Sequence, residues 1–483
     1  MSTPKRLEDL GRHDSWDGVR AVVAGMGVSG FAAADNLTHQ GARVTALDES
    51  DAGDRTEKAT ILEILGADVR LGPGSTVRLP DEVDVLVTSP GWSPASHLLR
   101  QATERGIPVW GEVELAWRLR DPEHAAPWLA VTGTNGKTTT VQMLDSILRA
   151  QGLRSVACGN VGLPMVEAVM DPTPYDVFAV ELSSFQLHYT SSLAAESAAV
   201  LNFAEDHLDW YETMAAYLAD KGRIYHGVRR ACVYNVADPQ TEQLVREAQV
   251  TEGARAIGFT LGIPMVGMVG LVDDVLADRA FIEEREDTAA ELCSVGDLAS
   301  DAPHVVSNAL AAAALARAHG VSATAVRDGL RAFKPDGHRI ADLGVIEGVR
   351  YVDDSKATNP HAAQSSLLAY DPVVWVAGGL SKGAAFDVLV GAVRDRLRGV
   401  VLLGQDRAAI AGALSRHAPD VRVIEVEGGE TDVMERVVGA AAGLARPGDT
   451  VLLAPGCASM DMFAHYGARG DAFADAVRRL RGR

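Results

Sequence analysis

The sequence is poor in cysteine, with four cysteines among 483 residues, and it has no long apolar run. Cys158, Cys232, Cys293 and Cys457 lie far apart and form no Cys-x-x-Cys pair, so neither a disulfide framework nor a zinc site is indicated. No run reaches the roughly 18 apolar residues that a membrane helix needs. Residues 1–16 are polar and lack the apolar segment of a signal peptide. We therefore expect a cytoplasmic protein with reduced, buried cysteines and no membrane partner.

Basic residues are also scarce, because 45 lysines and arginines face 65 acidic residues and give a net charge of −20. This balance argues against a nucleic-acid partner. The length predicts roughly three domains at about 150 residues each. A Pro-rich stretch at 121–127 and the break at Phe333-Lys334-Pro335-Asp336-Gly337 suggest the bounds 1–122, 123–336 and 337–483.

A phosphate-binding loop opens the second of these domains, between an apolar strand at 128–132 and a helix at 141–150. Gly133 and Gly136 allow backbone N–H groups to approach a phosphate, Lys137 can reach the β- and γ-phosphates, and the Thr138 hydroxyl can bind Mg²⁺. Val131 stands where the generic pattern has glycine, so the match is to a variant loop. The alternative is an ordinary glycine-rich turn, and the strand and helix on either side favour a nucleotide site.

The first domain alternates strands (19–24, 43–47 and 83–88) with helices (31–40 and 56–65), as parallel α/β sheets do. The segment 25–30 reads Gly-x-Gly-x-x-Gly, and Asp48 ends the second strand. Taken alone, this pattern suggests NAD or FAD, but the same loop holds any diphosphate. The turn Ser89-Pro90-Gly91 ends a later strand at the same edge.

Carboxylates follow two further strands of the second domain. Glu181 follows the strand at 176–180, and Glu205-Asp206-His207 follows the strand at 197–203, where oxygen ligands would meet Mg²⁺. A structural histidine is the alternative for His207. Lys221 lies on a predicted helix at 214–228, where a solvated charge is the simplest interpretation. Residues from about 250 to 300 are acidic and irregular with short β-like pieces, and we expect a solvated surface extension there.

The third domain again alternates, and polar loops follow its strands at 350–352, 373–377 and 450–454. Two loops carry an isolated lysine, Lys356 and Lys382, and the last carries Ser459. Polar loops at the carboxyl ends of three parallel strands predict one composite site.

The segment Val-Thr-Gly-Thr-Asn-Gly-Lys-Thr-Thr at 131–139 resembles the ATP loop of the Mur ligases, which build peptidoglycan, and of the folylpolyglutamate synthetases. The runs Glu-Leu-Ser-Ser-Phe-Gln-Leu from Glu181 and Asp-Asp-Ser-Lys-Ala-Thr-Asn from Asp353 are similar to one Mur ligase branch, and so is 454–463. One departure is Tyr466, where phenylalanine is expected. The resemblance covers the whole chain. It implies an α/β fold with a Rossmann-like UDP-binding domain, a P-loop ATPase-like central domain and a Rossmann-like C-terminal domain.

The resemblance also implies site residues, grouped by ligand. Those for ATP are Gly133, Thr134, Asn135, Gly136, Lys137, Thr138, Thr139, Asn308, Arg339 and Asp354. Those for the UDP-linked substrate are Val28, Ser29, Asp48, Ser89, Pro90, Gly91, Asn160 and Gln186. Those for D-glutamate are Thr358, Lys382, Ser459 and Tyr466. The implied Mg²⁺ ligands are Thr138, Glu181, His207 and Lys221, and the implied catalytic residues are Lys137, His207, Lys221 and Lys356.

The implied reaction joins D-glutamate to UDP-N-acetylmuramoyl-L-alanine with ATP and Mg²⁺, through an acyl phosphate. In this family a lysine at the place of Lys221 carries a carbamate, which would turn a cation that repels Mg²⁺ into an anion that attracts it. We expect a monomer. The alternatives are another amino-acid ligase on the same scaffold, an NAD-dependent oxidoreductase and a nucleotide-regulated binding protein. The oxidoreductase leaves the phosphate loop without a role.

Overall fold

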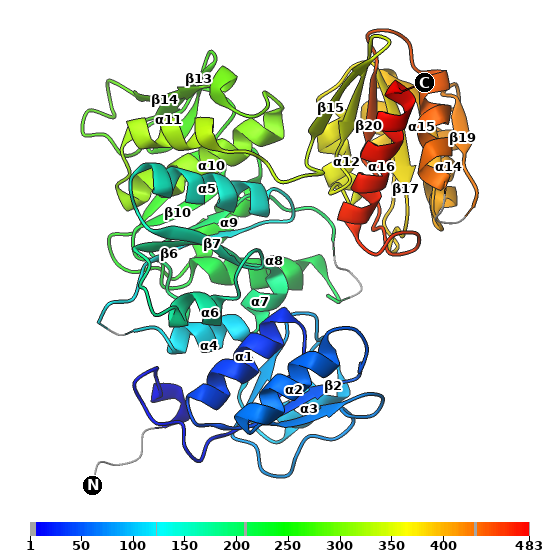
Figure 1. Cartoon of the computed structure of the whole chain (residues 1–483). Coiled ribbons are helices and arrows are strands. Elements are labelled where there is room, and N and C mark those ends of the chain that lie inside the picture. Colours follow the sequence, from blue (N-terminus) through cyan, green and yellow to red (C-terminus); the bar gives the residue numbers. More distant parts are fainter. Residues whose placement is uncertain (1–5, 122, 207–209, 429–431, 483) are drawn as a thin grey trace. The chain divides into compact units, whose positions relative to one another are not determined.

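The computed structural model describes residues 6–121, 123–206, 210–428 and 432–482. It contains three β-sheets, each flanked by helices (Figure 1). They are distributed over two compact units, the first made of residues 1–203, 210–298 and 305–333 and the second of 204–209, 299–304 and 334–483. Within the described ranges, no helix combines the length and the hydropathy needed to cross a membrane.

The first sheet has five parallel strands in the order β3-β2-β1-β4-β5. Its strands are β1 (Arg20–Ala24), β2 (Arg43–Asp48), β3 (Asp68–Leu71), β4 (Val85–Thr88) and β5 (Val109–Gly111). Its helices are α1 (Val28–His39), α2 (Arg55–Leu65), α3 (His97–Glu104) and α4 (Glu112–Arg118). Helix α1 begins at Val28, inside the glycine-rich segment, and not at the predicted residue 31.

The central sheet has nine strands in the order β14-β13-β12-β11-β10-β9-β6-β8-β7, and only the pairs β12–β13 and β13–β14 are antiparallel. The strands are β6 (Trp128–Thr132), β7 (Ser155–Gly159), β8 (Val177–Glu181), β9 (Ser197–Val200), β10 (Ala231–Asn235), β11 (Arg255–Phe259), β12 (Met268–Val272), β13 (Val275–Asp278) and β14 (Ala290–Ser294). The helices are α5 (Lys137–Ala150), α6 (Met165–Met170), α7 (Ser184–His188), α8 (Met214–Gly222), α9 (Pro239–Glu247), α10 (Pro303–His319) and α11 (Ala323–Ala332).

Successive side chains of β6 point to opposite faces of this sheet and pack against different layers of helices. Leu129 and Val131 pack with α5, α10 and α11, whereas Trp128 and Ala130 belong to a core that also contains Val23 and Val87 of the first sheet. Figure 1 shows α5 and α10 on one side of this sheet and α6 and α7 on the other. Because one apolar core continues from the first sheet into the central one, these two sheets form a single compact unit.

The expectation for residues 250–300 is wrong. Strands β11 to β14 continue the central sheet, and Val269, Leu276 and Leu292 are buried in its core. Each strand is only four or five residues long, and the loop at 260–267 between β11 and β12 carries exposed apolar residues. The sequence pattern therefore does not separate the buried positions from the exposed ones. The segment is part of the fold rather than a solvated extension.

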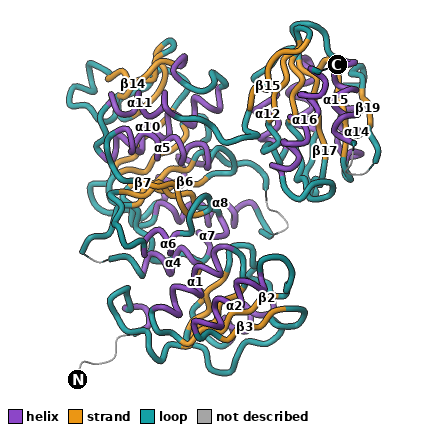
Figure 2. Tube along the Cα trace, in the orientation of Figure 1, coloured by secondary structure: helices purple, strands orange, loops and turns teal. Residues whose placement is uncertain are grey.

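The third sheet has six strands in the order β15-β16-β20-β17-β18-β19, antiparallel only between β15 and β16. The strands are β15 (Ala341–Ile346), β16 (Val349–Asp353), β17 (Val373–Gly378), β18 (Leu397–Leu403), β19 (Val423–Glu425) and β20 (Thr450–Leu453). The helices are α12 (Pro360–Leu367), α13 (Asp387–Val393), α14 (Arg407–His417), α15 (Val433–Leu444) and α16 (Tyr466–Arg481) (Figure 2). In all three sheets the polar loops follow the carboxyl ends of parallel strands.

Candidate active site

The phosphate loop lies where β6 ends and α5 begins. Gly136 caps the helix with a left-handed φ of 83°. A Cβ atom at this position would lie 2.4 Å from Oδ1 of Asn308 on α10, so only glycine allows this close approach. Helix α5 begins at Lys137, four residues before the predicted start, and its N-terminal N–H groups therefore face the loop. The structure places Asn308, which the family resemblance implied as an ATP residue, beside this loop.

Asn202 fixes the shape of this loop, and sequence reasoning missed it. The Asn135 N–H donates to Asn202 Oδ1 at 2.9 Å, and Asn202 Nδ2 donates back to the Asn135 carbonyl at 3.1 Å. The Thr134 N–H donates to the Asn202 carbonyl at 3.0 Å. The available signal was its position directly after β9, which pairs with β6. Its three bonds fix the loop backbone at residues 134 and 135.

Two lysines converge on the same carbonyl of the loop. Lys137 Nζ donates to the carbonyls of Gly133 and Thr134, both at 2.9 Å, and Lys221 Nζ donates to the Gly133 carbonyl at 2.9 Å. Lys221 is only 2% exposed and its Nζ lies 4.7 Å from the centre of the Tyr217 ring. The interpretation of Lys221 as a solvated surface charge is therefore wrong. Two cations at one loop suit a ligand with several phosphate charges.

Glu181 ends β8 beside the phosphate loop, and only one of its two carboxylate oxygens is hydrogen-bonded within the described residues. Its Oε1 accepts a hydrogen bond from Asn160 Nδ2 at 2.8 Å, while its Oε2 is buried without a partner in the described part of the chain. A buried oxygen anion of this kind fits a bound Mg²⁺. Half-buried Thr138 offers a hydroxyl on the adjacent loop. Among the described residues no three acidic, histidine or cysteine side chains cluster as a metal site, and His207 lies outside the described residues.

The glycine-rich loop of the first domain is built by close packing of backbone. A Cβ atom on Gly30 would lie 1.8 Å from the Gly25 carbonyl, so α1 can approach the loop only with glycine there. The Ser89 N–H donates to the Ala24 carbonyl at 2.9 Å and its hydroxyl donates to the Gly25 carbonyl at 3.2 Å. The Ser89-Pro90-Gly91 turn therefore adjoins this loop, with Val28 exposed and Ser29 half-buried at the start of α1.

Asp48 and Gln186, two predicted substrate residues, are engaged in local hydrogen bonds. The Met26 N–H donates to one Asp48 carboxylate oxygen at 2.6 Å and the Ser50 N–H donates to the other at 2.9 Å. Gln186 is buried, and its amide oxygen accepts from the Ser183 N–H at 2.9 Å in the cap of α7. In these positions both side chains shape the loops that carry them.

The three polar loops of the C-terminal domain are hydrogen-bonded to one another. The Gly456 N–H donates to the Ala357 carbonyl at 2.8 Å, and Leu380 and Ala458 exchange two backbone bonds of 2.9 Å. The Ser355 hydroxyl donates to the Tyr466 carbonyl at 2.7 Å. The three loops that the sequence predicted to form one site are therefore connected to one another. Its predicted residues are Lys356, Thr358, Lys382, Ser459 and Tyr466.

Within this set, Lys356 Nζ lies 4.1 Å from the centre of the Tyr466 ring. Lys382 is exposed and has a left-handed φ of 50°, next to two glycine-rich turns. Ser459 is buried and Thr358 half-buried. A tyrosine ring over a lysine is an aromatic–cation contact that phenylalanine would also provide, so the departure at Tyr466 leaves this contact intact.

Arg469 of α16 is hydrogen-bonded to two of these loops. It was not found from the sequence. Its guanidinium donates to the Ser355 hydroxyl at 3.0 Å, the Ser355 carbonyl at 2.8 Å and the Cys457 carbonyl at 3.1 Å. It is 1% exposed, and burial lowers the pKa of its guanidinium to about 10. The available signal was an arginine on the otherwise apolar side of α16. Its bonds tie the loop after β16 to the loop after β20.

Asp354 and Arg339 occupy the start of this domain. Asp354 is buried, accepts a short bond from the Ser366 hydroxyl and accepts the Ile340 N–H at 3.3 Å. Burial raises the pKa of its carboxyl to about 6, against the opposing effect of these hydrogen bonds and of the Arg339 charge. His338, just before Arg339, pairs with the buried carboxylate of Asp353 at 2.6 Å.

Fold and loops together define a nucleotide-binding α/β protein, and comparison with known proteins gives the family. Residues 19–111 match the MurD-like N-terminal domain of Mur ligases, 131–316 the Mur ligase middle domain and 338–457 the Mur ligase glutamate ligase domain. The chain belongs to the Mur ligase family.

Similar proteins cover nearly the whole chain. A UDP-N-acetylmuramoylalanine–D-glutamate ligase of Streptomyces avermitilis is 59% identical over 96% of this chain and 99% of its own length. The protein of the same description from Thermobifida fusca is 51% identical, again over 96% and 99%. Among solved structures, the UDP-N-acetylmuramate–alanine ligase of Thermotoga maritima shares the fold, with a TM-score of 0.57 at 17% identity over 96% of this chain and 99% of its own.

Proposed function

We propose that the chain joins the amino group of D-glutamate to the alanine carboxyl of UDP-N-acetylmuramoyl-L-alanine, with conversion of ATP to ADP and phosphate. The observation that carries this proposal is the 59% identity to a ligase of that description, over almost the full length of both chains. The loops support it as well, because a lysine-bearing phosphate loop and a separate cationic set of loops suit one phosphoryl donor and one acidic acceptor.

In the first step the alanine carboxylate attacks the γ-phosphorus of ATP, ADP leaves and an acyl phosphate forms. Negative charge gathers on the transferring group, and Lys137 and the N-terminus of α5 are suited to stabilise it. Asn308, Thr139 and the loop amides of residues 133–136 would position the phosphates. In the second step the D-glutamate amine attacks the acyl carbon, phosphate leaves and the amine proton is lost.

Glu181 and Thr138 are the residues that would hold Mg²⁺, with His207 as a further candidate. Bound there, it would neutralise phosphate charge and polarise the γ-phosphoryl group. Lys221 is a candidate for carbamylation, since a buried lysine beside the loop can become neutral more readily than an exposed one.

The D-glutamate carboxylates would bind at the C-terminal loops, where Lys382, Lys356, Thr358 and Ser459 supply cations and hydroxyl groups. Tyr466 would hold Lys356 in place. Val28, Ser29, Asp48 and the turn 89–91 would surround the uridine diphosphate, and Asn160 and Gln186 would belong to the same substrate site. Because the reaction consumes ATP, we assign it to the cytoplasm, and we expect a monomer.

A phosphate-release assay tests this proposal. The purified chain is given ATP, Mg²⁺ and UDP-N-acetylmuramoyl-L-alanine, with a panel of D- and L-amino acids. We expect phosphate release only with the UDP-linked substrate and D-glutamate together. Release with another amino acid in place of D-glutamate would identify a different ligase of the same scaffold, and ATP hydrolysis independent of both substrates would contradict the proposal.

A further inference from the structure

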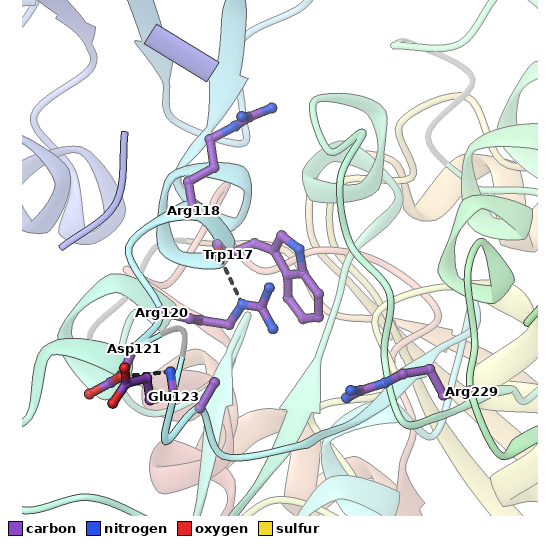
Figure 3. A pocket seen from close by; sticks show the side chains of 7 residues that line it. Trp117, Arg118, Arg120, Asp121, Glu123 and Arg229 are labelled. Atoms are coloured by element: carbon purple, nitrogen blue, oxygen red, sulfur yellow. Dashed lines mark hydrogen bonds between the residues drawn. The ribbon is translucent and has the colours of Figure 1, made fainter. Parts of the chain in front are cut away.

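A polar pocket of about 330 Å³ lies at the end of α4, between the residues that lead into β6 and those that lead into β10. Figure 3 shows Trp117, Arg120 and Arg229 around it. Strand β6 begins on this side, at Trp128, and the phosphate loop follows its other end after Thr132. The pocket is therefore at the opposite edge of the central sheet from the ATP loop.

Arg120 is held in a fixed position in this pocket. Its Nε donates to the Trp117 carbonyl at 2.7 Å, and its guanidinium carbon lies 3.1 Å from the centre of the Trp117 ring. The two remaining NH₂ groups of the guanidinium have no hydrogen bond or ion pair with the residues that the structure describes. Arg118 differs, because its guanidinium is paired with Glu114 at 2.7 Å.

Arg229 faces Arg120 across the pocket and also lacks an acidic partner in the described ranges. Figure 3 shows its side chain extended toward the Arg120 guanidinium. Burial, together with the charge of Arg229, lowers the pKa of Arg120 to about 10. Two like charges therefore line one pocket and repel each other, in a chain with a net charge of −20.

The acidic residues at the rim do not neutralise this pair. Asp121 accepts the backbone N–H groups of Glu123 and His124 at 2.9 and 3.2 Å, and the ring nitrogen of His13 lies 3.7 Å away. In Figure 3 the carboxylates of Asp121 and Glu123 lie on the far side of Arg120 from Arg229. The space between the two guanidinium groups is thus left for an anion.

We propose that Arg120 and Arg229 bind the phosphoryl group of a small phosphomonoester, at a site separate from the ATP and UDP-substrate sites. Guanidinium groups present paired N–H donors that match phosphate oxygens. The volume exceeds that of a phosphate ion and is near the lower end for small-molecule pockets. Glu123 at the rim can accept hydrogen bonds from hydroxyl groups of the ester.

Calorimetric titration of glycerol 3-phosphate into the full chain tests this site, with ADP and UDP present at saturating concentration to fill the other phosphate sites. We expect saturable binding to the wild type. Arg229→Ala should weaken it at least about tenfold, because a charged hydrogen-bond partner is lost. Arg230→Ala is the matched control, because the neighbouring Arg230 is also exposed but does not line the pocket. It should bind as the wild type does.

A second variant, Arg120→Lys, keeps the charge but loses the paired donors, and it should also bind more weakly. Its melting temperature without ligand shows whether it is folded. Inorganic phosphate in place of the ester separates recognition of the phosphoryl group alone from recognition of the whole ester, and uncharged glycerol should not bind. Absence of saturable binding of either phosphate compound to the wild type, or equal affinity in Arg229→Ala, would overturn the proposal.

Discussion

The glycine-rich loop at 25–30 and the phosphate loop at 133–138 have the same place in their sheets but different side chains. Each follows a buried parallel strand and leads directly into a helix. The first contains no lysine, and an acid, Asp48, holds its Met26 amide. The second is approached by Lys137 and Lys221 and adjoins Glu181, whose Oε2 has no partner among the described residues.

The difference shows that the backbone arrangement determines where a diphosphate can bind, and that side chains determine whether phosphoryl transfer can follow. A loop with amides alone can hold a diphosphate, whereas transfer also requires charges that stabilise the transition state. The two loops therefore have different expected responses to mutation and to ligands.

Lys137→Ala should have the largest effect of the changes that distinguish the two loops, and this effect should be on kcat. Loss of a charged transition-state contact costs on the order of 3 kcal/mol, at least about 100-fold in kcat. Binding of the UDP-linked substrate, measured by calorimetry, should remain near the wild-type value. The matched change in the first loop, Ser29→Ala, should do the reverse and mainly raise KM for that substrate. Wild-type turnover in Lys137→Ala would remove the basis for the ATP assignment.

Lys221→Ala should also be nearly inactive, with kcat lowered by about 100-fold, because it removes a buried cation, or its carbamate, from the loop. If a carbamate is formed, added acetate should restore part of the rate by standing in for the lost carboxylate. Lys221→Arg is the control, since arginine keeps its charge and cannot be neutralised for carbamylation. Full activity of Lys221→Ala in CO₂-depleted buffer would mean that Lys221 has no catalytic role.

The two loops should also differ in nucleotide preference. UDP at about 100 times its dissociation constant should stabilise the native state by about 2.7 kcal/mol and raise the melting temperature by several degrees. NAD should leave the melting temperature unchanged. Thermal unfolding with each nucleotide measures this difference. The Lys137→Ala variant is used because binding at its ATP loop is weakened. A shift with NAD and none with UDP would instead favour the oxidoreductase interpretation.

The smallest expected effect concerns the contact that joins the domains of these two loops. Glu112 of α4 is buried and accepts the Val166 N–H of α6 at 2.6 Å, and its Oε2 has no partner in the described residues. Burial raises the pKa of its carboxyl from 4.5 to about 7. The folded state therefore holds a proton that the unfolded state has lost, and stability falls as pH rises through this range.

Relative to Glu112→Gln, the wild type should lose about 1.4 kcal/mol of unfolding free energy between pH 6 and pH 8, the equivalent of one pKa unit. Urea unfolding at both pH values measures the difference. Glu123→Gln, at an exposed acidic position, is the control and should follow the wild type. Parallel pH profiles for the wild type and Glu112→Gln would show that Glu112 does not titrate in this window.

The residues that could be recognised in advance are those whose chemistry depends on local spacing. Gly136 next to Lys137, after an apolar strand, is sufficient to predict a phosphate loop, and three polar loops after three strands predict a composite site. Asn202 and Arg469 were missed, since each acts through partners that are distant in sequence. The 255–294 segment showed short β-like pieces, but its place in the central sheet was missed for the same reason, because strand pairing depends on neighbours and not on a strand's own pattern.

The sequence by itself determined the alternating α/β pattern, the position of both glycine-rich loops and the family, because these depend on short-range periodicity and on motifs of a few residues. Only the tertiary structure decided that Lys221 is buried against Gly133, that Asn308 packs against Gly136 and that Arg469 joins loops from separate strands. The physical reason is that burial and hydrogen-bond partners arise from segments that meet only when the sheets form.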